Sequence, residues 1–67
     1  MNSATTNTVR ITKGSKQIAF RVTRHGDGRV TAERSSGVVW RPIGGLKAAR
    51  SQMDAARAEG FEVVAAA

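Results

Sequence analysis

The chain lacks several residue types that would point to specific chemistry. Among its 67 residues there is no cysteine and no tyrosine, and there is one histidine and one proline. Without cysteine no disulfide can brace the fold, and a single histidine cannot form a usual zinc site. No apolar run approaches the roughly 20 residues that a membrane-spanning helix needs. The first seven residues are polar and uncharged, so we expect no secretory signal and a cytoplasmic location.

Catalytic groups are equally sparse. His25 lies in a glycine-rich segment beside Asp27, with no nucleophile indicated near it, and we interpret it as an exposed turn residue. Gly44 and Gly45 precede a predicted helix without the Lys-Ser/Thr of a phosphate-binding loop, a pattern typical of a chain corner. We therefore predict a binding module rather than an enzyme, with no cofactor and no metal.

The charge of the chain is unevenly distributed. Eleven basic residues face five acidic ones, which gives a formal net charge of +6. The whole excess lies in residues 1–43, whereas basic and acidic residues are equal in number in residues 44–67. This asymmetry is typical of a surface that binds an acidic polymer, either a nucleic acid or a membrane. The alternative is charge that serves solubility alone.

Alternating apolar and polar residues predict antiparallel strands over the first two thirds of the chain. The strand pattern occupies residues 8–12, 17–23 and 29–34, with turn residues between these segments. A short β-prone segment at 38–41 is either a fourth strand or the lead into a helix. We expect the residues before this region, 1–7, to form a disordered tail. The predicted inward side chains are Val9, Ile11, Ile18, Phe20, Val22, Val30 and Ala32.

Residues 45–59 change to a helical period, and Gly60 is a typical C-terminal stop. Residues 61–64 predict a short last strand, and 65–67 a tail. The single helix must cover the inward face of the sheet, so the predicted fold is α+β, with one domain at residues 8–64. It is an antiparallel three- or four-stranded meander with one C-terminal helix packed on one face. The helix contributes Leu46, Ala49, Met53 and Ala56 to the core, with Trp40 and Ile43 at the seam.

The sheet face away from the helix is expected to carry arginine, threonine and other short side chains. Arginine suits bidentate contacts with phosphate and guanine, and a narrow sheet fits the DNA major groove, about 12 Å wide. All three aromatic residues are interpreted as core, which favours a double-stranded partner over a single-stranded one. A merely solvated face is the alternative, and Glu33 on the same face favours it. The candidate nucleic-acid-binding residues are Arg10, Lys13, Lys16, Arg21, Thr23, Arg24, Arg29, Thr31 and Arg41.

Three segments carry a resemblance to known DNA-binding domains: Val39-Trp40-Arg41, Ala48-Ala49-Arg50 and Asp54-Ala55-Ala56. The first two are separated by a glycine-containing corner. The pattern resembles the strand-end tryptophan and alanine-rich helix of the plant ethylene-response-factor domain. In its order of elements over residues 8–59 it also resembles the arm-binding amino-terminal domain of phage and transposon integrases. The resemblance implies a three-stranded sheet, backed by one helix, that reads the major groove. It implies groove contacts by Arg10, Arg21 and Arg29, with Trp40 near the sheet edge.

The expected function is therefore a small basic nucleic-acid-binding protein, with double-stranded DNA as its partner. An accessory or regulatory protein of a phage or plasmid fits this description. The alternative is a small phage-type adaptor or inhibitor, whose basic face docks on an acidic protein surface. A homodimer that pairs edge strands at residues 61–64 is a third hypothesis. We expect no membrane partner, because the predicted helix lacks a basic polar face.

Overall fold

Two long strands form the centre of the molecule, β1 (Thr5–Lys13) and β2 (Lys16–Arg24). They pair antiparallel from Thr5 opposite Arg24 to Lys13 opposite Lys16, and Gly14 makes the turn with a φ of 59°. β3 (Val30–Ser35) pairs with β2, and the short β4 (Arg41–Gly44) pairs with β3 at one edge. This computed structural model describes residues 3–66 of the chain.

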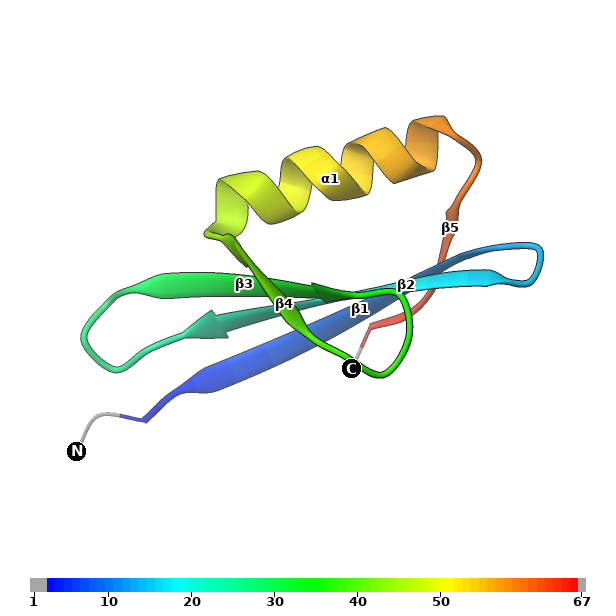
Figure 1. Cartoon of the computed structure of the whole chain (residues 1–67). Coiled ribbons are helices and arrows are strands. Elements are labelled where there is room, and N and C mark those ends of the chain that lie inside the picture. The colour runs from blue at the N-terminus through cyan, green and yellow to red at the C-terminus, as the bar shows by residue number, and fades with distance from the viewer. Residues whose placement is uncertain (1–2, 67) are drawn as a thin grey trace.

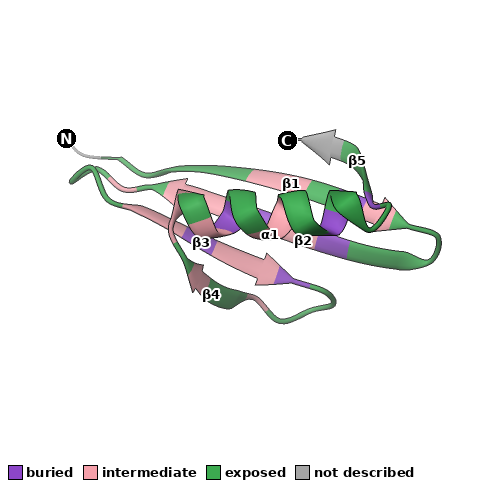
Figure 2. Cartoon of the chain, turned by 90° about the horizontal axis from the view of Figure 1, so that it is seen from above, coloured by how far each residue is buried: buried purple, intermediate pink, exposed green. Residues whose placement is uncertain are grey.

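The helix α1 (Leu46–Ala58) follows β4 and crosses one face of the sheet (Figure 1). The chain then reaches the opposite edge, where β5 (Glu62–Ala66) pairs with β1. The strand order is β4-β3-β2-β1-β5, and every neighbouring pair is antiparallel. Seen from above, the helix lies over the middle of the sheet (Figure 2). The predicted α+β fold, an antiparallel sheet with one helix on one face, is confirmed.

The strand boundaries differ from the prediction at both ends of the chain. Residues 5–7, expected in the tail, belong to β1 because β2 extends far enough to pair with them. β4 occupies 41–44 rather than 38–41, and its Pro42 is tolerated because β4 is an edge strand. The expected tail at 65–67 is strand through Ala66. Of the remaining predicted tail residues, Ser3 and Ala4 precede β1, and Met1, Asn2 and Ala67 lie outside the described residues.

The core lies between the helix and the central strands. Ile11 is 0% exposed and Phe20 is 1% exposed, and Phe61 closes the core behind the helix end. Val9, Ile43 and Met53 pack against its border. The interpretation of Phe20 and Phe61 as core residues is therefore confirmed.

Trp40 is not part of this core, contrary to the prediction. It is half-buried on the sheet face away from the helix, and the guanidinium carbon of Arg21 lies 4.2 Å from its ring centroid. The physical reason is the course of the chain before β4. Residues 36–40 leave the sheet as a loop, and this loop brings the indole over the strands from outside rather than beneath the helix.

Candidate nucleic-acid interface

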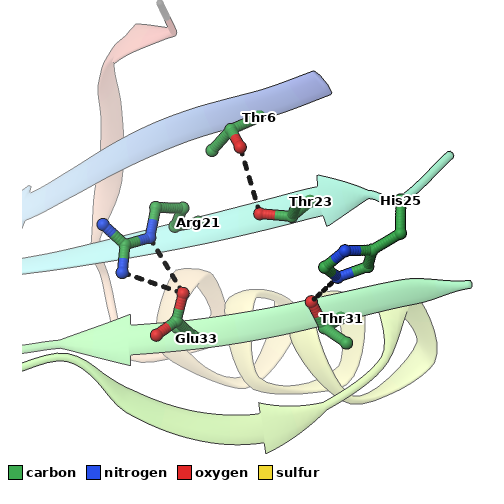
Figure 3. Close-up of polar contacts among 6 residues, drawn as sticks. All are labelled: Thr6, Arg21, Thr23, His25, Thr31 and Glu33. Carbon is green, nitrogen blue, oxygen red and sulfur yellow. Dashed lines mark hydrogen bonds and ion pairs between the residues drawn. The ribbon is translucent and has the colours of Figure 1, made fainter. Parts of the chain in front are cut away.

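The sheet face away from the helix, called the open face, carries polar side chains from β1, β2 and β3. Directly opposed residues of an antiparallel pair share a face, so the strand register assigns its members. Several of them bond to one another in front of the helix (Figure 3). Arg21 Nε donates to Glu33 Oε1 at 2.9 Å, His25 Nε2 lies 2.8 Å from Thr31 Oγ1, and the hydroxyls of Thr6 and Thr23 are 3.1 Å apart.

The formal charges of the open face cancel. Arg10 and Arg21 lie on it, and so do Glu33 and Glu62, the latter through its pairing with Thr12. Arg21 is also neutralised locally, since its Nη2 lies 2.8 Å from Glu33 Oε1. The expected arginine-rich sheet face is therefore corrected to a face of threonines and balanced charges, with one ion pair between Arg21 and Glu33.

Two arginines expected on this face lie elsewhere. Arg29 precedes β3, in the turn, where its backbone N–H and its Nε both donate to Asp27 at 3.0 and 2.7 Å. These bonds hold the pKa of the Asp27 carboxyl below its ordinary value. Arg41 is paired across the strands with Arg34, whose guanidinium bonds Gln52 of the helix. Arg41 therefore lies on the helix side of the sheet.

Lys13 is also engaged within the fold. Its Nζ donates to the backbone carbonyl of Glu59 at 2.6 Å, at the end of the helix, and its stem lies 3.5 Å from where a Cβ on Gly60 would be. The positive φ of Gly60, 107°, lets the chain turn away there. Lys13 thus joins the β1–β2 turn to the last turn of the helix.

We expect Lys13→Met to lower the free energy of unfolding by about 0.5–1 kcal/mol, because a cation at a helix C-terminus and its bond to a carbonyl are both lost. Urea denaturation measures the change. Lys16→Met is the matched control, since Lys16 occupies the same turn and has no such bond. An equal loss in both variants would show that the contact with Glu59 contributes nothing specific.

Four of the nine predicted residues have no ion pair or side-chain hydrogen bond within the described part of the chain. These are Arg10, Lys16, Arg24 and Arg41. The other five hold hairpins, the helix end or the open face together. The available positive charge is thus smaller than the sequence suggests, and most of it lies away from the open face.

Basic side chains gather around the turn between β3 and β4, at Ser35–Gly37. Three surface pockets meet there, and Ser36 lines all of them. One, of about 450 Å³, includes Lys16 and Arg34, and another, of about 250 Å³, includes Arg34 and Arg41. The third, of about 340 Å³, lies on the open face and is called the tryptophan pocket. Its lining includes Arg10, Gln17, Ala19, Ser36 and Trp40.

We call Arg10, Lys16, Arg34 and Arg41 the turn cluster. No carboxylate among residues 3–66 lines any of the three pockets around it. Cations around pockets that no carboxylate lines produce a local positive potential, even where the rest of the surface is balanced. The turn cluster is therefore the strongest candidate in the described structure for contact with a polyanion.

Arg34 was missed by the sequence prediction. Its guanidinium carbon lies 5.9 Å from the Phe20 ring centroid, and its Nη1 donates to Gln52 Oε1 at 3.0 Å. The stem thus covers the edge of the core while the charged head reaches the surface. A signal for this was present, because the alternation that points Ala32 inward also points Arg34 toward the helix side.

No known protein family, curated protein or solved structure matches the chain. Over residues 3–66, the structure contains no helix that is both long and apolar enough to cross a membrane. In the same range it places no three acidic or histidine side chains where they could together hold a metal ion.

Proposed function

We propose that the protein binds nucleic acid through the turn cluster, and that double-stranded DNA is its partner. The observation that carries the proposal is that four basic side chains, with Arg10 on the open face and Arg34 and Arg41 on the helix side, line three pockets that share Ser36. No carboxylate of the described residues lines any of these pockets. Arginine and lysine are the main side chains that contact phosphate. Contacts with phosphate supply affinity and fix the orientation of the protein on the nucleic acid, whereas the base sequence is recognised by contacts with the base edges.

The geometry of Arg34 supports this assignment. Its guanidinium bonds Gln52 and lies over the Phe20 ring, so less side-chain freedom is lost when a phosphate binds. Arg41 and Lys16 approach the same turn from β4 and β2, and both are exposed. A phosphate chain that follows the turn therefore meets one anchored arginine and two exposed cations.

The test is a titration of labelled random duplex DNA, followed by fluorescence anisotropy at several salt concentrations. If all four members of the turn cluster contact phosphate, the logarithm of the binding constant falls with the logarithm of salt with a slope of about −3.6. Arg41→Gln should reduce the slope by about 1, because one contact is lost. Arg50→Gln, on the exposed surface of the helix, is the control and should leave it unchanged. Absence of binding at low salt would overturn the proposal.

One observation favours the adaptor as a second candidate. Val38 is 96% exposed and Val39 is 60% exposed, and both lie in the loop between β3 and β4. Two exposed apolar residues beside cations suit an acidic protein surface with an apolar recess. If the protein is an adaptor, a pull-down should recover one protein partner in stoichiometric amount, and nuclease treatment should not release it. The double variant Val38→Ser with Val39→Ser should then abolish this recovery. If nucleic acid is the partner, the same double variant retains its affinity for DNA.

A further inference from the structure

The tryptophan pocket is lined by an indole on the open face, whereas Phe61, which lines one of the other two pockets, is a buried core residue. Trp40 is the only tryptophan of the chain, and Arg21 holds it from one side at 4.2 Å from the ring centroid. Arg21 is itself fixed by two contacts with Glu33, at 2.8 and 2.9 Å. The indole is therefore held in place before any ligand arrives.

The other lining residues include two side chains that form hydrogen bonds and one small side chain, Ala19. Ala19 lies between the longer side chains of Gln17 and Arg21 on the same strand face, and its small side chain leaves the space that forms the pocket. The carboxamide of Gln17 offers both donors and an acceptor, and the hydroxyl of Ser36 does the same. Arg10 contributes a cation to the lining.

We propose that the tryptophan pocket receives one unpaired nucleobase, stacked on Trp40, while the adjacent phosphate lies against Arg10 or another member of the turn cluster. This inference rests on the proposed function and names the kind of nucleic acid that the site prefers. A volume of about 340 Å³ is near the lower limit of pockets that hold small molecules, which suits a single nucleotide. A base inside a duplex stack cannot enter it, so the preferred partner has an unpaired nucleotide at an end, a junction or in a single strand.

The position of Trp40 on the open face also favours binding of an unpaired base. A single-stranded partner was not expected from the sequence, because all three aromatic residues were predicted to lie in the core. Without an exposed aromatic residue, the open face would offer no surface on which a base could stack. Trp40 provides one, because it is half-buried and lies over the open face beside a pocket. Ser36 lines this pocket and both cationic pockets, so the three pockets adjoin one another around the same residue.

The experiment compares a blunt duplex with the same duplex carrying a short single-stranded overhang. Anisotropy gives the affinities, and the emission of Trp40, the single tryptophan, reports stacking directly. Stacking of one base on an aromatic side chain corresponds to a roughly 5- to 140-fold gain in affinity. We therefore expect tighter binding of the overhang duplex by a factor in that range, with quenching of the Trp40 emission.

Two variants make the test specific to the pocket. Ala19→Ile fills the space with a residue that suits a strand, and it should remove the preference for the overhang while the affinity for blunt duplex persists. Thr8→Ile adds a similar apolar side chain to the same face, outside the pocket lining, and should leave the preference intact. Equal affinity for both duplexes, or a preference that survives Ala19→Ile, would overturn this inference and leave the proposed function standing. Failure of both duplexes to bind would overturn the proposed function itself.

Discussion

Phe20→Ala is expected to leave the chain largely unfolded at room temperature. Phe20 is 1% exposed and belongs to the same core cluster as Ile11, Ile18, Ala56 and Phe61, in which it is one of the two largest fully buried side chains. Truncation of a buried phenylalanine to alanine costs about 3–5 kcal/mol. A core in a domain of this size rarely supplies more than about 3–5 kcal/mol in total. Circular dichroism and the dispersion of amide resonances should both show the loss of the fold.

Phe20→Leu is the matched control, because it keeps an apolar side chain of similar reach. We expect it to cost about 1–2 kcal/mol and to preserve a cooperative urea transition. Val38→Ala should change the stability by less than about 0.5 kcal/mol, since Val38 is almost fully exposed. A Phe20→Ala protein with a cooperative transition close to that of the parent would show that the core contributes little to stability.

The sequence pattern was sufficient for the central sheet and the helix. The alternation through β1, β2 and β3 determines which side chains face the helix, because the strand period places every second residue on one face. The period of α1 likewise identifies Ala49 and Ala56 as its buried positions. Both inferences depend on local geometry alone, and for that reason they needed no knowledge of the partner element.

The segment between β3 and β4 could not be predicted in the same way. Residues 36–44 have no clear alternation, and the run of Val38, Val39 and Trp40 favours a strand by composition. The structure instead leaves both valines exposed in a loop, and it begins the strand at Arg41. The position of an edge strand depends on how it aligns with its neighbour, and here the register shifts between Ala32 and Glu33.

The candidate site was hardest to predict because it depends on which charges pair. The cancellation of Arg21 by Glu33 follows from their direct opposition across β2 and β3, a consequence of the length of the intervening turn. The contact of Lys13 with the end of the helix joins residues 46 positions apart. A count of basic residues along the chain does not show which of them form ion pairs or hydrogen bonds. For this reason, the prediction from sequence placed too much positive charge on the open face.

Charge reversal at the turn cluster should have the largest effect on binding. Lys16→Glu with Arg41→Glu replaces two exposed cations that have no polar side-chain partner in the described residues. A unit charge contributes about 1 kcal/mol at contact distance in water, and the two reversals together change the charge by about four units. With screening by salt, we expect duplex affinity to fall on the order of 100-fold, as measured by anisotropy.

Lys47→Glu with Arg50→Glu is the matched control, because it makes the same change of charge on exposed positions of the helix. An acidic residue at position 47 is favourable because it lies in the first helical turn, whereas Arg50 lies beyond that turn and Arg50→Glu places like charges four residues apart with Asp54. Circular dichroism therefore has to show first that the control is folded. If binding depends on the turn cluster, the control loses far less affinity than Lys16→Glu with Arg41→Glu. Equal losses in the two double variants would mean that net charge alone drives binding, and the turn cluster would then not be a defined site.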